Sequence, residues 1–356
     1  MRPFNSSVST RLGVFLALFG TACAGANTAE LREGSSGLSG AIPGGDGRSL
    51  AGYKAEFTAN AMQGMDSLMI RTNQVWQDDD EEVLLGLFAP GVSYVAPDGN
   101  LLSNAEGVRA FVESELDRTT GHEIWRDDFA ASGLMTYIYG RYKVLGAQAG
   151  TADDHEGVQL TVAVRDRFTW KIRSKMYVPF EGAPPATPRE VAQDPPPHLT
   201  PDDIRATFGR RAVRGQNERA EWAVNSYFYM NSFLGRVRYA WNNDDFDTLV
   251  SLMDTKVVSR FPYDIPAVGR VNTGYSLERL LPAVGEMHMD ILDFEASERL
   301  AFAMGSYSLE GMGSQIDGYF SAVVQTTDDG PVLRALLFSG AGAREVATLG
   351  EGPGPS

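Results

Sequence analysis

Two stretches decide how this chain folds: MQGMDSLMIRTNQVWQDDDEEVLLGLF at residues 62–88 and YFYMNSFLGRVRYAWNNDDFDTLVSLM at residues 227–253. They repeat one pattern at an offset of 165 residues, the spacing between Trp76 and Trp241. The other matched pairs include Met65 and Met230, Ser67 and Ser232, Arg71 and Arg236, Asp79 and Asp244, and Leu84 and Leu249. Self-similarity at the spacing of a whole domain predicts two homologous domains in tandem rather than a solenoid.

The composition restricts the classes of function. The chain has 356 residues, of which 43% are hydrophobic and 10% aromatic, which is ample for packed cores in two or three domains. Its 46 acidic residues against 31 basic ones give a formal net charge of −15. Such a surface repels phosphate backbones, so we expect no nucleic acid among the partners of this protein.

The N-terminus has the pattern of an export signal. Positive charge and an apolar run at residues 12–19 precede a segment of small residues. Cys23, the one cysteine of the chain, resembles the lipidated cysteine of a bacterial lipoprotein, which predicts a signal peptide over residues 1–23. The exported protein would then be anchored in the cell envelope and would touch the membrane only through its N-terminal lipid. Cleavage after Ala24 or Ala26 is the alternative, and it would release a soluble periplasmic or secreted protein.

Three further segments have the composition of linkers. Residues 24–51 are rich in Gly, Ser and Ala, which predicts a flexible tether. Residues 181–200 are rich in proline, which favours a semi-rigid spacer. The Gly- and Pro-rich residues 343–356 are expected to form a disordered tail. The folded domains are therefore predicted at residues 52–180 and 201–342.

Within each predicted domain, helical periodicity gives way to strand periodicity. Residues 62–76 place apolar side chains at steps of three and four, and the acids at 78–82 are expected to cap the next helix, as Asp244 does in the second copy. The predicted strands of the first domain are residues 92–95, 124–129, 134–145, 158–165 and 168–178. Gly140 interrupts one of these strands and predicts a bulge. Helices followed by strands predict an α+β fold with an antiparallel sheet in each domain.

Each half resembles a nuclear-transport-factor-2-like (NTF2-like or SnoaL-like) domain. The resemblance rests on the helix that ends in Trp76 or Trp241, the Asp-rich cap with its Leu-Leu helix, and a Gly-x-Tyr strand. The Gly-x-Tyr positions are Gly140 and Tyr142, and Gly305 and Tyr307. The family implies a cystatin-like cone, in which a curved antiparallel sheet packs on N-terminal helices. Because its members commonly dimerise through their sheets, the resemblance also implies an internal pseudo-dimer of the two domains.

The resemblance implies that an enzyme of this family would place a carboxylate or a histidine inside the cone. We take His122 and Asp128 as the candidate acid and base, with Asp127 as the alternative carboxylate. The corresponding candidates in the second half are His288 with Asp290 or Asp293. The competing interpretation, which we favour, places both histidines at exposed starts of strands with the aspartates facing solvent.

Aromatic and apolar residues predict a ligand pocket. The candidate pocket residues are Tyr94, Tyr137, Tyr139, Phe302 and Met304. Tyrosine hydroxyls above an apolar floor can orient a ligand. Since Phe and Met replace two of these tyrosines in the second half, a polar ligand would favour the first domain. Trp76 and Trp241 are expected to be core residues.

No motif points to a metal ion or a cofactor. The four histidines have no ligand spacing, and the sequence contains neither a phosphate-binding glycine loop nor a nucleophilic serine elbow. We therefore expect a non-catalytic envelope lipoprotein that binds a small apolar molecule or a protein partner. The alternative is an isomerase, cyclase or dehydratase that acts on a small hydrophobic carbonyl compound by acid/base catalysis in the first domain. A third hypothesis, an assembly module that recruits an envelope protein, requires exposed apolar faces.

Overall fold

The computed structural model describes most of the predicted domains. The described residues are 50–103, 105–146, 154–166, 168–180, 199–209, 216–262, 264–311 and 314–340. The chain divides into two units between Glu56 and Phe57, and the fold reported below belongs to the second unit. The predicted signal peptide with Cys23, nearly all of the tether and of the proline-rich linker, and the tail lie outside the described residues.

The first half of this unit is a six-stranded sheet whose helices mostly precede it in the sequence. Its elements are α1 (Leu50–Gln77), α2 (Glu81–Leu85), β1 (Phe88–Val95), β2 (Leu101–Leu102), α3 (Ala105–Arg118), β3 (Thr119–Ser132), β4 (Met135–Gly146), β5 (His155–Asp166) and β6 (Thr169–Pro179). The strands lie in the order β2-β1-β6-β5-β4-β3. β1 and β6 are parallel, because the chain leaves β1 through β2 and α3 and returns beside it only at the end of a four-stranded meander.

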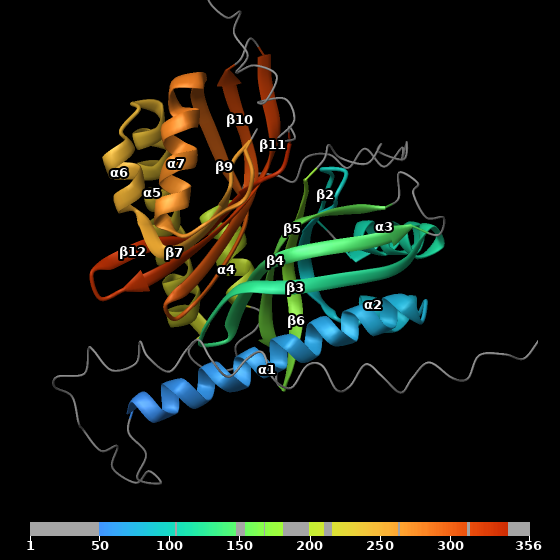
Figure 1. The fold of residues 1–356 in the computed structure, drawn as a ribbon. Coiled ribbons are helices and arrows are strands. Elements are labelled where there is room, and N and C mark those ends of the chain that lie inside the picture. Colours follow the sequence, from blue (N-terminus) through green and yellow to red (C-terminus); the bar gives the residue numbers. More distant parts are fainter. Residues whose placement is uncertain are drawn as a thin grey trace, which may run out of the picture. The chain divides into compact units, whose positions relative to one another are not determined.

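The second half repeats this plan (Figure 1). Its elements are α4 (Pro201–Gly209), α5 (Gln216–Asn242), α6 (Phe246–Ser251), β7 (Met253–Arg260), β8 (Ala267–Val268), α7 (Arg270–Leu280), a short 3-10 turn (Leu281–Ala283), β9 (Val284–Ser297), β10 (Leu300–Gly311), β11 (Ser314–Thr327) and β12 (Gly330–Phe338). The strand order is β8-β7-β12-β11-β10-β9, with β7 and β12 parallel. The α+β fold class, with two helix-covered sheets, is confirmed. Each sheet is mixed rather than wholly antiparallel.

Acidic residues end the long helices and cap the short ones. Asp79 and Asp244 have φ angles of 57° and 52°, a left-handed conformation in which a helix ends. Asp80 and Asp245 then accept a hydrogen bond from the backbone N–H three residues further on. The N-cap in the second half is therefore Asp245 and not the predicted Asp244, because Asp244 is the residue that ends α5.

Two equivalent tryptophans fix the long helices onto the sheets. Both indoles are buried. The indole N–H of Trp76 donates to Thr119 Oγ1 at 2.9 Å, and that of Trp241 donates to the carbonyl of Gly285 at 3.3 Å. The two acceptors lie at the starts of the equivalent strands β3 and β9. The predicted core role of the two tryptophans is confirmed.

Bulges interrupt β3 and β9 at equivalent places. The pairing of β3 with β4 skips Asp127, and the pairing of β9 with β10 skips Leu292. Gly140 lies opposite the first bulge on β4, where an added Cβ would come within 1.7 Å of the carbonyl oxygen of Trp125. The sequence predicted a bulge on the strand that contains Gly140, whereas the bulge lies on the neighbouring strand β3. A glycine is needed at position 140 because the bulged backbone of β3 lies too close to leave room for a side chain.

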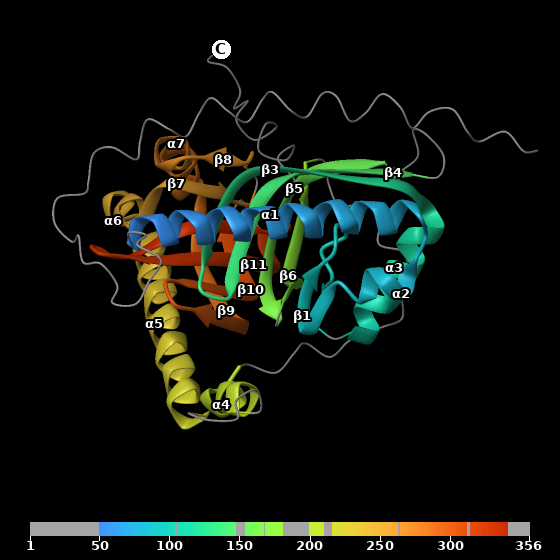
Figure 2. The same ribbon diagram turned by 90° about the horizontal axis from the view of Figure 1, so that it is seen from below.

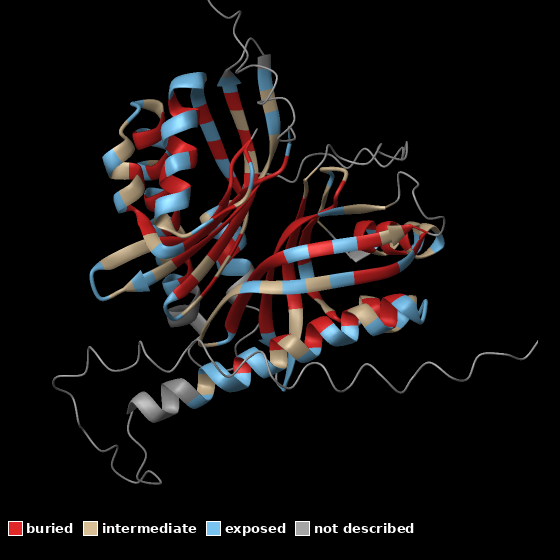
Figure 3. Cartoon of the chain, viewed as in Figure 1, coloured by how far each residue is buried: buried red, intermediate tan, exposed pale blue. Residues whose placement is uncertain are grey.

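Within the described residues, buried hydrophobic side chains form three clusters, and Figure 3 shows where buried residues lie along the helices and strands. The first cluster lies between the first sheet and helices α1 to α3. Figure 2 shows α1 lying across that sheet, with α2 and α3 near the C-terminal end of α1. The second lies between the second sheet and α5 to α7. The third cluster, here called the inter-sheet core, joins residues of both sheets, such as Leu160 on β5 and Phe302 on β10. Successive strand residues therefore alternate between a helix-covered core and the inter-sheet core.

Candidate functional site

The predicted acid/base histidine lies inside the first half. His122 on β3 is 1% exposed, its Nε2 lies 2.9 Å from the hydroxyl of Tyr177, and its ring centroid lies 5.1 Å from that of Trp76. The interpretation of His122 as an exposed residue is therefore wrong. Burial is the main cause that lowers the pKa of His122 well below its ordinary value, and the positive charge of Lys175 lowers it further. The imidazole is therefore neutral at pH 7.

Other polar side chains surround His122 in this core. They are Tyr94, Tyr142, Lys175 and Tyr177, all buried. Burial lowers the pKa of Lys175 to about 7 and raises the pKa of the three tyrosines. Nδ1 of His122 and the hydroxyl of Tyr142 are buried with no hydrogen-bond partner among the described residues. Because buried polar atoms are normally paired, this core is one candidate place for a polar group of a ligand.

The second half has no counterpart of this polar core. Strand pairing shows that His122 and Met287 occupy equivalent positions in the two halves. Each pairs with a residue of the neighbouring strand, and those two partner residues are themselves equivalent. Tyr177 aligns in the same way with Phe338, and Lys175 aligns with Leu336. The core of the second half is therefore apolar at the positions where the first half carries its imidazole, phenol and amine.

His288 is not the equivalent of His122. It aligns with Glu123, one residue further along the strand, and both His288 and Asp290 are exposed. A shift of one residue in a strand moves a side chain to the other face of the sheet. The predicted equivalence of the two histidines is therefore wrong.

Asp128 lies on the inter-sheet side of the first sheet. The bulge at Asp127 reverses the alternation of β3, so Asp128 and His122 face opposite sides. The carboxylate of Asp128 accepts hydrogen bonds from the hydroxyl of Tyr137 and, at 3.0 Å, from Nη2 of Arg334 in the second half. The structure does not bring the candidate acid and base together.

Arg173 and Asp293 form the matching contact in the opposite direction. Nη1 and Nη2 of Arg173 each donate to Asp293 at 2.6 Å, and its Nε donates to Glu295 at 2.7 Å. Strand pairing aligns Arg173 with Arg334 and Asp293 with Asp128. Each half thus gives one arginine to the aspartate of the other half, the pattern of an interface between two identical subunits.

The hairpin turns make a second reciprocal contact. The N–H of Leu134 donates to Ser297 Oγ at 2.7 Å, and the N–H of Arg299 donates to Ser132 Oγ at 3.1 Å. Ser132 and Ser297 are 165 residues apart, and so are Leu134 and Arg299. The repeat found in the sequence is therefore also a repeat of the contacts between the halves.

The sequence did not identify either interface arginine as a site residue. Arg173 and Arg334 each sit at a bulge, on β6 and β12 respectively, which directs the side chain toward the other half. For Arg334 the available signal is a charged residue within an otherwise apolar strand, whereas the strand of Arg173 also carries Lys171 and Lys175. That signal cannot identify the partner, because the partner lies in the other domain.

The five predicted pocket residues do not line one cavity. Tyr94 lies in the core beneath α1 to α3. Tyr137, Tyr139, Phe302 and Met304 belong to the inter-sheet core. Of the five, Tyr139 lines a cavity in the described part of the chain.

This cavity, here called the apolar cavity, has a volume of about 420 Å³ and is lined by both halves. Its uncharged lining residues are Tyr139, Val158, Phe180, Ile265, Pro266 and Val268, and its charged ones are Asp127, Arg141, Arg260 and Asp264. Ile265 and Val268 are 63% and 50% exposed, so the cavity opens to solvent at the β7–β8 connection. Its volume and lining are typical of sites for small molecules.

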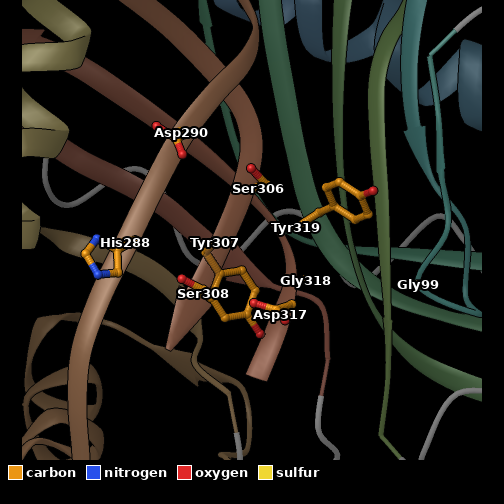
Figure 4. A pocket seen from close by; sticks show the side chains of 9 residues that line it. All are labelled: Gly99, His288, Asp290, Ser306, Tyr307, Ser308, Asp317, Gly318 and Tyr319. Atoms are coloured by element: carbon orange, nitrogen blue, oxygen red, sulfur yellow. The ribbon is translucent and has the colours of Figure 1, made fainter. Parts of the chain in front are cut away.

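A partly corresponding cavity of about 400 Å³, here called the polar cavity, is lined by β9, β10 and β11 together with Gly99 of the first half (Figure 4). Ser306 and Gly99 line it, and they align with Arg141 and Asp264 of the apolar cavity. The remaining lining residues are His288, Asp290, Tyr307, Ser308, Asp317, Gly318 and Tyr319. The two cavities thus differ in chemistry, since hydroxyls, an imidazole and carboxylates replace most of the apolar walls.

The described residues give no indication of a metal centre or a membrane span. No group of three or more His, Cys, Asp or Glu side chains within them is arranged to hold a metal ion. In the same residues, no helix is both long and apolar enough to cross a membrane.

Comparisons with known proteins give structural matches to parts of this chain. No protein-family model matches the sequence, and no curated protein matches it. An NTF2-like protein of unknown function from Shewanella oneidensis is 20% identical, with a TM-score of 0.28, over 31% of this chain and 95% of that one. An epoxide hydrolase of the LEH-like type from Mycobacterium tuberculosis is 16% identical, with a TM-score of 0.26, over 31% and 80% of the two chains. An NTF2-like protein of unknown function from Pseudomonas putida is 10% identical, with a TM-score of 0.29, over 33% and 87%.

Proposed function

We propose that this chain is a non-catalytic binding protein that holds a small apolar molecule in the apolar cavity. The observation that carries the proposal is the cavity itself: about 420 Å³, with aliphatic and aromatic walls and a mouth at Ile265 and Val268. Burial of an apolar ligand against such walls is favourable at about 25 cal/mol per Å². We further propose that the two halves act as an internal pseudo-dimer, since the cavity takes residues from both.

The positions of the acid/base candidates support binding over catalysis. A general acid and base must both reach the reacting atoms of one substrate. His122 lies in a helix-covered core, whereas Asp128 is held by Tyr137 and Arg334 in the inter-sheet core. An aspartate engaged by an arginine in this way contributes to the interface between the halves.

The experiment is titration of the full chain with N-phenylnaphthylamine, a neutral dye that fluoresces in apolar sites. We expect saturable binding with one site per chain. Val268→Trp should fill the mouth of the cavity and remove binding, whereas Val271→Trp, on a more exposed position of α7 outside the cavity, should leave it unchanged. Undiminished binding to the Val268→Trp protein would refute the proposed site.

The enzyme hypothesis remains the second candidate, and the polar core of the first half favours it. His122 and Tyr177 are grouped there with Lys175, whose pKa is about 7, and an amine with such a pKa can exchange protons near neutral pH. The test is deuterium exchange next to the carbonyl of a cyclic enone. Exchange that His122→Gln abolishes and His288→Gln preserves would support an isomerase, cyclase or dehydratase.

We propose that the protein acts in the cell envelope as a lipoprotein. The sequence around Cys23 supports this, and Cys23 lies outside the described residues. Mass spectrometry of the protein from its source should find a lipid mass on an N-terminal Cys23. The Cys23→Ser variant should lose that mass and leave the membrane fraction, and a membrane fraction that keeps the variant would contradict the proposal.

A further inference from the structure

We infer that the ligand of the apolar cavity carries a hydroxyl group on its apolar body, and that this hydroxyl donates a hydrogen bond to the carboxylate of Asp264. The inference rests on the proposed binding function and names its ligand class, an alcohol or a phenol. Asp264 lies in the β7–β8 connection, lines the cavity and is 3% exposed. The apolar walls formed by Val158, Phe180 and Pro266 would take the body of the ligand.

The two carboxylate oxygens of Asp264 have different surroundings. Oδ1 accepts the backbone N–H of Ile265 at 2.8 Å and forms an ion pair with Arg279. Oδ2 is buried and has no hydrogen-bond partner among the described residues. Because buried polar atoms are normally paired, Oδ2 is a place for a donor that the described residues do not supply.

A neutral donor is sufficient at this place. Arg279 already balances the charge of Asp264 through Oδ1. What Oδ2 lacks is therefore a donor hydrogen rather than a further positive charge. A hydroxyl supplies that hydrogen, and its hydrogen bond to a carboxylate is stronger than one between two neutral groups.

Tyr139 favours a hydroxyl over other neutral donors. It lines the same cavity, and its own hydroxyl makes no hydrogen bond to another described residue. Burial raises the pKa of Tyr139, so its phenol stays protonated and can donate. Tyr139 and Asp264 both interact electrostatically with the guanidinium of Arg260, so they lie near one part of the wall. A hydroxyl can both donate and accept, which suits a site with one acceptor and one donor.

The duplication shows that the turn does not need a carboxylate at this position. The equivalent residue is Gly99, 165 residues earlier. The N–H of Gly99 donates to the carbonyl of Ala96 at 2.9 Å, and the N–H of Asp264 donates to the equivalent carbonyl of Phe261 at 3.2 Å. Glycine thus closes the same turn in the first half, where it lines the polar cavity. The carboxylate is therefore a feature of the apolar cavity and not of the fold.

The test is equilibrium dialysis of the full chain with four probes that share one skeleton: diphenylmethanol, benzophenone, diphenylmethane and diphenylmethylamine. The alcohol donates and accepts, the ketone only accepts, the hydrocarbon does neither, and the amine is a cation at pH 7. A hydrogen bond to a charged group predicts that diphenylmethanol binds about ten- to a hundredfold more tightly than diphenylmethane. Benzophenone should lie between them, since it can accept only from Tyr139.

Asp264→Asn is the matched variant. Its side-chain oxygen can keep the contacts with Ile265 and Arg279, while an amide N–H replaces the acceptor Oδ2. It should remove the advantage of diphenylmethanol over benzophenone. Asp328→Asn, at an acid whose side chain is 89% exposed and which does not line the cavity, should keep that advantage. Val268→Trp should remove the binding of all four probes.

The outcomes separate this inference from the proposed function. If diphenylmethanol and diphenylmethane bind equally to the unmodified protein, the inference is wrong and the binding function stands. Tightest binding of benzophenone would assign the contact to a donor of the wall, and tightest binding of the amine would assign a cation to Asp264; either result would overturn the inference. If none of the four binds, the proposed function itself fails. The order of the four probes on the unmodified protein decides the matter even if Asp264→Asn does not fold.

Discussion

At the scale of single residues, two reciprocal arginine–aspartate pairs cross between the halves. The side chains of Arg173 and Arg334 are only 7% and 9% exposed, and those of Asp293 and Asp128 are 19% and 14% exposed. Asp293 and Glu295 raise the pKa of Arg173 against the effect of burial, so the guanidinium stays charged. Charges at this depth are tolerated because each is paired, and removal of one partner leaves the opposite charge less well compensated.

Asp293→Ala should therefore destabilise the protein by about 3 kcal/mol, because Arg173 loses the two hydrogen bonds that it donates to Asp293 and retains Glu295 as its ion-pair partner. Asp127→Ala is the matched control, since its partner Arg141 is 60% exposed and such pairs contribute at most about 1 kcal/mol. The free energy of unfolding in urea measures both. Equal losses for the two variants would contradict the importance given to the inter-sheet pair.

Lys175 should make stability depend on pH above neutrality. Its pKa falls from 10.5 to about 7 in the folded state, because burial disfavours the charged amine. Between these values the unfolded chain binds more protons than the folded one, so stability should rise as the pH increases from about 7 to about 10.5. Urea unfolding at several pH values measures the slope. Lys175→Met should flatten it, and an unchanged slope in that variant would refute the assignment.

At the scale of elements, the bulges decide which face of a strand each residue occupies. The bulge at Asp127 turns Asp128 toward the second half, and the bulges at Arg173 and Arg334 place the two guanidinium groups to meet the aspartates. Gly140 is the position opposite the first of these bulges. Its lack of a side chain allows the bulged backbone to approach.

Gly140→Ala should destabilise the protein by more than about 2 kcal/mol, because the new Cβ would overlap the carbonyl of Trp125. Gly235→Ala in α5 is the control. No atom lies within 4 Å of a Cβ added there, and replacing a helical glycine should stabilise by about 0.5–1 kcal/mol. Thermal unfolding distinguishes the two, and a neutral Gly140→Ala would mean that β3 is not bulged at this place.

At the scale of the whole molecule, the inter-sheet core joins the two halves through apolar side chains from both sheets. A half expressed alone would expose its share of that core, including Phe302, Val323 and Leu337 in the second half. Exposed apolar faces of this kind drive association.

Residues 201–342 alone should therefore pair or aggregate, and Arg334→Asp should weaken pairing by placing like charges together. Sedimentation velocity at several concentrations measures the association. A well-behaved monomer at high concentration would contradict the proposed pseudo-dimer.

The sequence by itself determined the duplication, the α+β class and the core tryptophans, because these follow from periodicity and from local caps. It also predicted the bulge near Gly140, although on β4 instead of β3. The tertiary structure alone decided which faces meet. One unpaired residue in a strand reverses the direction of every side chain after it, and the register of a strand is a property of its neighbours. For this reason the sequence could not predict that His122 and Asp128 lie on opposite faces of the sheet, or that Tyr139 faces the inter-sheet core. It also could not predict that Arg260 lines a cavity, because no local sequence pattern indicates one.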